Sequence, residues 1–164
     1  MRQATEHPLK ICVVFDDDDS ARNAQVLIRH VASDCRCDTR LFQSDDLNTP
    51  GPGLAAARTA SDMDILMLAV RDDRMLPDHV QFWLGLCMGL RDANQEGAMV
   101  VLIAEAAETP DPEYSLLEYL ESVAAIQRFA FFPRQAGFPA GARRAIPKTG
   151  ASRRFESGAG GRSV

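Results

Sequence analysis

Histidine and cysteine are scarce in this chain of 164 residues, which contains three histidines and four cysteines. A structural zinc site needs four ligands, usually two cysteine pairs or one pair with histidines. Cys35 and Cys37 form the one close pair, and the histidines are widely scattered. The sequence therefore disfavours a metal role for this pair. Cys12 and Cys87 lie in apolar segments, where a cysteine typically acts as a small buried hydrophobic residue.

Long hydrophobic runs are also missing. No apolar run approaches the ~20 residues that a membrane-spanning helix requires. Residues 1–10 lack the apolar stretch of a secretory signal. We therefore expect a cytoplasmic protein that makes no contact with a membrane.

The glycine-rich loops that bind phosphate groups are absent as well. Neither the P-loop pattern nor the Gly-x-Gly-x-x-Gly dinucleotide pattern follows the first predicted strand. The Gly-x-Ser-x-Gly nucleophile elbow of hydrolases is absent too. These absences disfavour a nucleotide-binding protein or a serine hydrolase, and we assign no catalytic residue and no certain cofactor.

Basic residues are few in the first part of the chain and concentrated at its end. Residues 1–134 carry 12 Lys and Arg against 22 Asp and Glu, which gives a net charge of −10. Residues 135–164 carry 6 against 1, a net charge of +5, together with six of the 11 glycines. We therefore predict a folded domain over 1–134 and a disordered basic tail over 135–164. The tail could contact an anionic partner, but the acidic domain opposes nucleic acid.

Apolar segments typical of strands alternate with segments of helical periodicity. The predicted strands are 10–15, 38–43, 64–70, 99–104 and 129–132, and the predicted helices are 20–31, 54–61, 77–94 and 112–127. Residues 44–53, ending in Pro-Gly-Pro-Gly, are predicted as a loop. This alternation predicts an α/β protein with three layers and a doubly wound, five-stranded parallel sheet. We expect the flavodoxin-like strand order 2-1-3-4-5.

Acidic residues follow two of the strands predicted to be neighbours. Asp16 to Asp19 come directly after the first strand, and Asp72 and Asp73 follow the third. Ligands bind at the carboxyl edge of such sheets, and carboxylates are typical Mg²⁺ ligands. Asp16, Asp17, Asp72 and Asp73 are therefore a candidate Mg²⁺ site. Two alternatives remain: the carboxylates cap a helix in a solvated acidic rim, or Arg71, Arg74 and Arg91 flank the site and pair with the carboxylates.

Residues 10–22 resemble the start of a bacterial response-regulator receiver domain, in which an apolar strand leads into acidic residues and a Ser-x-Arg helix start. The match is limited to this first strand and loop. The resemblance implies a flavodoxin-like fold with Mg²⁺ held by the acidic loop. The phosphoacceptor of a receiver would correspond to Ala69, its Ser or Thr to about Ala104, and its Lys to Phe132. Phosphorylation is therefore not expected, and the chain resembles a degenerate receiver.

In a flavodoxin, the loop after the first strand is rich in Ser, Thr and Gly and holds the flavin phosphate. Asp16–Asp19 would repel that phosphate, so flavin bound in the usual way is disfavoured. We therefore expect a non-enzymatic, receiver-like signalling module that acts on a protein partner. The alternative is a small Mg²⁺-dependent enzyme or ligand-binding protein that uses the acidic crevice. The sequence does not identify the partner, the substrate or the oligomeric state.

The predicted tail gives a first testable prediction. A chain that ends at Gln135 should fold with a melting temperature within a few degrees of that of the full chain. The reason is that a polar, glycine-rich segment cannot offset an ordering cost of ~1–2 kcal/mol per residue. Thermal unfolding followed by circular dichroism checks this. If the truncated chain fails to fold, the domain boundary is wrong.

Overall fold

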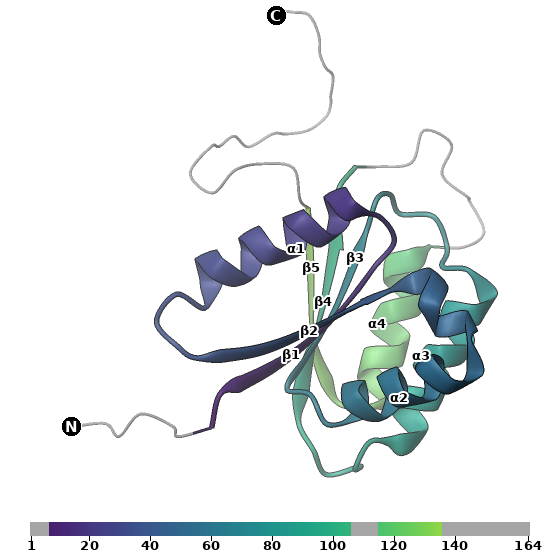
Figure 1. Ribbon diagram of the computed structural model, residues 1–164. Coiled ribbons are helices and arrows are strands. Elements are labelled where there is room, and N and C mark those ends of the chain that lie inside the picture. The colour runs from purple at the N-terminus through teal and green to yellow at the C-terminus, as the bar shows by residue number, and fades with distance from the viewer. Residues whose placement is uncertain (1–6, 106–114, 136–164) are drawn as a thin grey trace, which may run out of the picture.

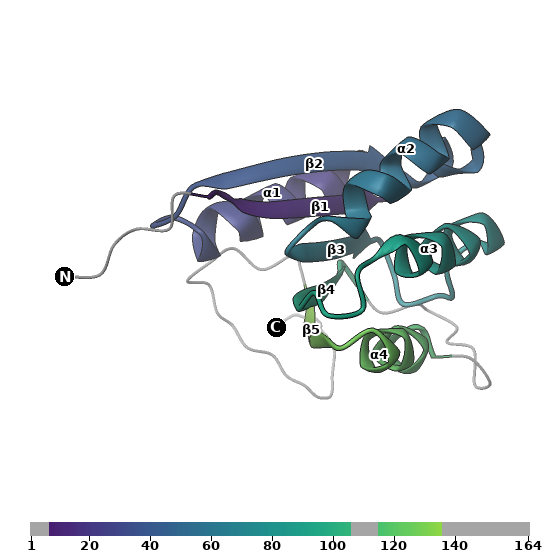
Figure 2. The ribbon, with the colours of Figure 1, turned by 90° about the horizontal axis from the view of Figure 1, so that it is seen from below.

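The computed structural model describes residues 7–105 and 115–135 of the chain. Five parallel strands form one sheet in the order β2-β1-β3-β4-β5. Helix α1 covers one face of this sheet, and α2, α3 and α4 lie side by side on the other (Figures 1 and 2). The predicted fold class and strand order are confirmed.

The elements follow one another as the alternating pattern predicts. The strands are β1 (Leu9–Phe15), β2 (Cys37–Gln43), β3 (Ile65–Val70), β4 (Gly97–Ile103) and β5 (Phe129–Gln135). The helices are α1 (Asp18–Val31), α2 (Pro50–Ser61), α3 (Asp78–Leu90) and α4 (Leu116–Ile126), with a 3₁₀ helix, η1 (Ser44–Asn48), before α2. Of the helices described, none is both long and apolar enough to cross a membrane.

Strands β1, β3 and β4 are apolar throughout because helices cover both of their faces. Successive side chains of a strand point to opposite faces of the sheet. Cys12 and Leu66 pack into the core beneath α2, α3 and α4, whereas Val13 and Met67 pack beneath α1. Cys12 and Cys87 are fully buried, as predicted, and burial raises the pKa of the Cys12 thiol to about 12.

The Pro-Gly-Pro-Gly segment is helical, so the loop predicted over 44–53 is wrong. Helix α2 begins at Pro50, and η1 fills residues 44–48. Proline suits the first helical position because the backbone N–H groups there have no partner within the helix. Gly53 is required for a different reason: a Cβ atom at this position would lie 2.7 Å from the carbonyl oxygen of Leu47. Only a residue without a side chain allows this close approach.

Helix α3 and strand β5 also end at residues other than those predicted. Helix α3 ends at Leu90 and not at Asn94, because Arg91 adopts an extended conformation. Strand β5 continues through Pro133 to Gln135, which an edge strand permits because its outer N–H groups need no ladder partner. Residues 112–114 of the predicted fourth helix and residues 136–164 of the predicted tail lie outside the described residues.

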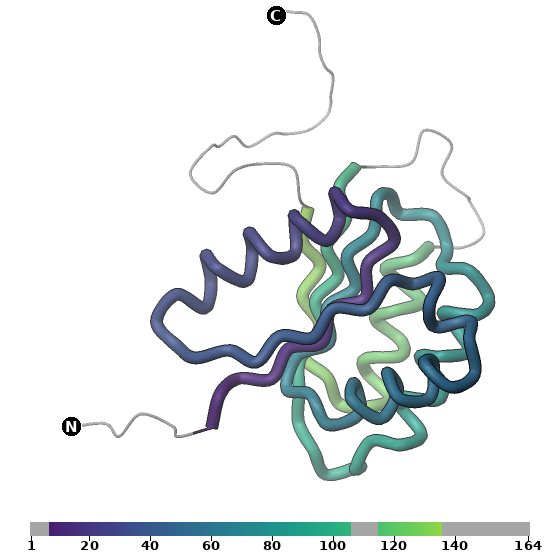
Figure 3. The backbone as a smooth tube through the Cα atoms, in the orientation of Figure 1, coloured from purple at the N-terminus to yellow at the C-terminus, as the bar shows by residue number. Residues whose placement is uncertain are grey.

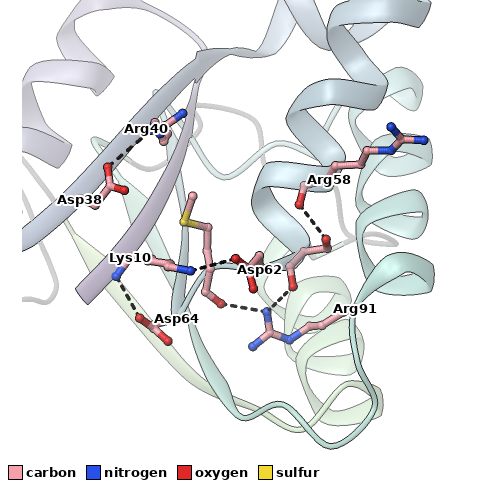
Figure 4. A network of polar contacts seen from close by, with 9 residues as sticks. Lys10, Asp38, Arg40, Arg58, Asp62, Asp64 and Arg91 are labelled. Atoms are coloured by element: carbon pink, nitrogen blue, oxygen red, sulfur yellow. Dashed lines mark hydrogen bonds and ion pairs between the residues drawn. The ribbon is translucent and has the colours of Figure 1, made fainter. Parts of the chain in front are cut away.

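Contrary to the prediction, Arg91 does not flank the acidic loops but joins four segments at the opposite, amino edge of the sheet. Figure 4 shows its guanidinium beside the end of α2 and the segment that leads into β3. Its guanidinium donates to the carbonyl oxygens of Ser61 at 3.2 Å, Met63 at 2.9 Å and Glu96 at 2.8 Å. The same group lies over the ring of Phe129, 4.4 Å from its centroid. Arg91 is only 7% exposed, and burial lowers the pKa of its guanidinium. The end of α2 and the starts of β3, β4 and β5 therefore share one buried cation.

Replacing this cation should destabilise the fold strongly. Arg91→Met should lower the free energy of unfolding by about 3–5 kcal/mol, because it leaves buried carbonyl oxygens without their donors. Arg29→Met, at an exposed position of α1, is the matched control and should change it by less than about 0.5 kcal/mol. Urea unfolding of both variants measures the difference. Equal effects would contradict a structural role for Arg91.

Candidate functional site

The candidate site lies where β1 and β3 end at the carboxyl edge of the sheet. The two strands pair in parallel, with Phe15 opposite Ala69, so the loops that follow them leave the sheet side by side. The backbone trace in Figure 3 shows both loops at the same end of the sheet. This arrangement brings the acidic residues after β1 close to Arg71, the first residue after β3.

Asp17 caps helix α1. Its carboxylate accepts the backbone N–H of Ser20 at 2.8 Å, and its second oxygen lies 3.1 Å from Nε of Arg71. The pKa of Asp17 is lowered, mainly because the Ser20 amide donates to the charged form, and Arg71 adds to this effect. Helix α1 therefore begins at Asp18, two residues before the predicted start at residue 20. Asp19, in the first helical turn, pairs with Arg22 instead.

Asp16 joins the loop after β1 to the loop after β3 by hydrogen bonds that involve backbone atoms. Its carboxylate accepts the N–H of Arg71 at 2.8 Å, and its own N–H donates to the carbonyl oxygen of Ala69 at 3.3 Å. Arg71 therefore binds Asp16 through its backbone and Asp17 through its side chain. We call these three residues the Arg71 latch. The guanidinium of Arg71 neutralises part of the negative charge of the loop after β1.

Asp72 lies on the other side of the loop after β3. Its carboxylate accepts the N–H of Arg74 at 3.1 Å and lies 3.6 Å from Nε of the same residue. Asp16, Asp72 and Arg74 form a polar rim on a cavity of about 200 Å³. The walls of the cavity are apolar and include Val14, Leu68, Val70, Met75 and Leu76.

Asp73 lines a separate hollow of about 260 Å³ at the carboxyl ends of β4 and β5, together with Ile103 and Pro133. The structure thus places Asp16 and Asp72 on one cavity and Asp73 on another. Over 7–105 and 115–135, no three His, Cys, Asp or Glu side chains are grouped to hold a metal ion. The Mg²⁺ site at Asp16, Asp17, Asp72 and Asp73 stays a prediction.

The positions that correspond to receiver chemistry carry no reactive group. Ala69 is fully buried near the end of β3, and its methyl group packs beneath α1. Ala104 follows β4 and donates its N–H to the carbonyl oxygen of Val70 at 3.0 Å. Phe132 lies in the edge strand β5. None of the three can accept or stabilise a phosphoryl group through its side chain.

Sequence reasoning found the acidic loop and offered Arg71 as a partner of its carboxylates. It missed that the backbone of Arg71 binds Asp16 while its side chain binds Asp17. The available signal was a basic residue directly after a central strand, opposite an acidic loop on the neighbouring strand. Sequence reasoning also missed the groove between α2 and α3, because it treated the segment before residue 54 as a loop. That groove contains the exposed side chain of Phe82.

The sequence matches no family model and no curated protein. Among solved structures, the flavodiiron core of Flv1 from Synechocystis sp. PCC6803 is similar at 12% identity and a TM-score of 0.52. The similarity covers 79% of this chain but only 30% of that one. A diflavin flavoprotein A3 from Nostoc sp. is similar at 15% identity and a TM-score of 0.50, over 79% of both chains. The chain therefore has a flavodoxin-like fold. The receiver resemblance of residues 10–22 stays a prediction.

The cap at Asp17 makes stability depend on pH. Asp17→Ala should lower the free energy of unfolding at pH 7 by about 1 kcal/mol. Because the folded-state pKa is lowered, the charge of Asp17 stabilises the fold above its ordinary pKa of ~3.9. This contribution disappears as the pH falls through the lowered value. The difference between wild type and Asp17→Ala should therefore shrink below about pH 4 in urea unfolding experiments.

Asp17→Asn separates the cap from the charge, because asparagine caps helices about as well as aspartate. This variant should keep most of the stability at pH 7 and lose the acid-dependent part. Asp34→Ala, in an exposed turn, is the matched control and should have little effect. A loss for Asp17→Ala that is the same at pH 3 and pH 7 would show that the charge of Asp17 contributes nothing.

Proposed function

We propose that this chain is a non-enzymatic, receiver-like regulatory module that acts by protein–protein contact and is not phosphorylated. The main support is the Arg71 latch. Asp16 and Asp17, the acidic residues expected to hold Mg²⁺ in a receiver, are bound by Arg71. A buried Ala69 stands where a phosphoacceptor carboxylate would have to be.

The cavity beside the latch supports contact with a protein. Its centre is formed by apolar side chains, among them Val70, Met75 and Leu76, and its rim is polar. An apolar centre with a polar rim is the usual anatomy of a protein–protein interface. A partner segment with an apolar side chain, flanked by groups that donate to Asp16 and Asp72, would match this surface.

The names of the similar structures raise flavin as a cofactor, but the described residues do not fit a flavin phosphate. Four consecutive carboxylates, Asp16 to Asp19, follow β1 in the loop and in the first turn of α1, where the phosphate would have to bind. The amino end of α1, which could bind an anion, is already capped by Asp17 through the Ser20 N–H. Phosphate would have to displace a bound carboxylate and approach three others.

One observation favours the alternative, a ligand-binding protein or small Mg²⁺-dependent enzyme. Asp16 and Asp72 both line the cavity of about 200 Å³. A cation or a cationic ligand in this cavity would contact both carboxylates. It would compete with Arg71 for Asp16 and with Arg74 for Asp72.

Nuclear magnetic resonance of ¹⁵N-labelled protein tests the site. We expect the amide signals of Asp16, Asp17 and Arg71 to stay unchanged on addition of Mg²⁺, of Mg²⁺ with beryllofluoride, or of flavin mononucleotide. A saturable shift with Mg²⁺ alone would support the alternative function. A shift that needs beryllofluoride would restore a phosphorylation role, and a shift with the flavin would contradict the steric and charge argument above.

A partner captured from cells that encode this chain should then be reconstituted with it from purified components. Binding should persist without Mg²⁺ or a phosphodonor. Met75→Asp, in the cavity, should weaken binding at least tenfold, because it places a charge in the apolar centre. Val26→Asp, at an exposed apolar position of α1, is the matched control and should bind like wild type. Equal binding by both variants would exclude this surface.

A further inference from the structure

The outer surface of the layer formed by α2, α3 and α4 is apolar at its centre. Helix α3 contains no charged residue from His79 to Leu90. Phe82 is 77% exposed, and Leu54 of α2 and Leu90 of α3 are exposed as well. Helix α3 lies between α2 and α4 in Figure 2, so the exposed residues of α3 belong to the middle helix of the layer. Leu54 and Phe82 line the same groove, and exposed apolar side chains that gather in this way typically mark an interaction site.

A groove of about 460 Å³ lies beside Phe82, between α2 and α3. Its apolar walls include Leu47, Pro50, Leu54 and Leu86. Two polar side chains of the groove, those of Trp83 and His79, already have partners within the chain. Nε1 of the buried Trp83 donates to the carbonyl oxygen of Gly53 at 3.0 Å, and Nε2 of His79 lies 2.9 Å from the carbonyl oxygen of Ser44. The groove therefore suits an apolar protein surface better than a polar small molecule.

We propose that this face binds a second copy of the chain, with the two α3 helices antiparallel about a two-fold axis. Large and small residues alternate on the exposed side of α3: Phe82, Gly85, Leu86 and Gly89. A Cβ atom built on either glycine would meet nothing within 4 Å, so both positions are open. When Phe82 faces Gly89 of the second copy, antiparallel spacing places Leu86 opposite Gly85. Each large side chain then fills an open position, as a self-complementary interface requires.

The charges at the ends of the layer select the antiparallel orientation. Asp78 begins α3, and Glu118 and Glu121 lie in the first half of α4. Arg58 lies in the last turn of α2, and Arg128 follows α4. All five side chains belong to exposed residues. An antiparallel second copy brings Asp78 and Glu118 of one chain toward the end that carries Arg58 and Arg128 of the other. A parallel copy would instead place the two acidic amino ends together.

Three exposed carboxylates also lie near the carboxyl ends of the helices, at Asp62, Asp92 and Glu96, so this end of the layer carries charges of both signs. Asp62, after α2, lies 2.9 Å from Nζ of Lys10. Asp92, after α3, accepts the N–H of Asn94 at 2.9 Å.

The surface is large enough for a stable dimer. A helix of 13 residues, such as α3, is ~20 Å long, and three packed helices span ~30 Å. The projected area of this helix layer is therefore ~600 Å², which does not include the extra area of protruding side chains. Each partner in a standard interface buries ~800 Å² of accessible surface, which is a comparable area. This dimer goes beyond the proposed regulatory function and does not depend on it, since Phe82 and Met75 line different hollows.

Sedimentation equilibrium of the full chain tests the proposal. The wild type should show a concentration-dependent mass that approaches twice the 18.0 kDa of one chain. Phe82→Asp should raise the dissociation constant at least tenfold, since it places an unpaired charge at the centre of the interface. Val31→Asp, at a 68% exposed position on the opposite face of the sheet, is the matched control and should dimerise like wild type.

A charge exchange tests the antiparallel orientation of the two copies, and it does so even if Phe82→Asp does not fold. Arg58→Glu should weaken the dimer, and adding Asp78→Arg to the same chain should restore it. A wild type that stays monomeric at millimolar concentration would overturn the proposal, and so would a Phe82→Asp dimer as tight as wild type. Failure of Asp78→Arg to rescue Arg58→Glu would overturn the antiparallel arrangement.

Discussion

The packing at the amino edge of the sheet depends on the buried guanidinium of Arg91. One cation satisfies carbonyl oxygens from the end of α2, the start of β3 and the turn before β4, and it packs against the ring of Phe129 in β5. A Cβ atom on Gly97 would lie 2.4 Å from this group, so glycine is needed there as well. The ladder of hydrogen bonds sets the register of β3, β4 and β5, and Arg91 adds a contact that links the segments leading into all three at one edge of the sheet.

A second arginine acts at the opposite edge of the sheet in a different way. Arg71 is exposed and binds Asp16 and Asp17 where β1 and β3 end. An exposed ion pair contributes at most about 1 kcal/mol, so the Arg71 latch does not hold the fold together. The latch instead affects which ligands this edge of the sheet can bind, because a carboxylate that already has a hydrogen-bonded partner attracts a second cation less strongly than a free one. Stability and candidate function therefore depend on arginines at opposite ends of the strands.

The sequence was sufficient to predict the strand order but not the details of the site. The central strands are continuous apolar runs, such as Ile65–Val70, and five such segments with helical intervals leave few topologies. Pro50 to Gly53 misled the prediction, because the same residues occur in loops and in first helical turns. The cap at Asp17 was indistinguishable from its neighbours, since four consecutive aspartates offer four candidate caps. The binding of Asp16 by Arg71 depends on the register in which β1 and β3 pair, and this register could not be predicted from the sequence.

The flavodoxin-like fold fixes where a ligand would bind but not which ligand. Strand order places the crevice at the carboxyl ends of β1 and β3, and helix α1 begins there with partial positive charge. That positive end can accept an external anion or a side-chain carboxylate. In this chain Asp17 occupies it, and Arg71 binds the same carboxylate from the other side. The two features that could attract a phosphate, a helix terminus and an arginine, are therefore both directed at the acidic loop of the protein itself.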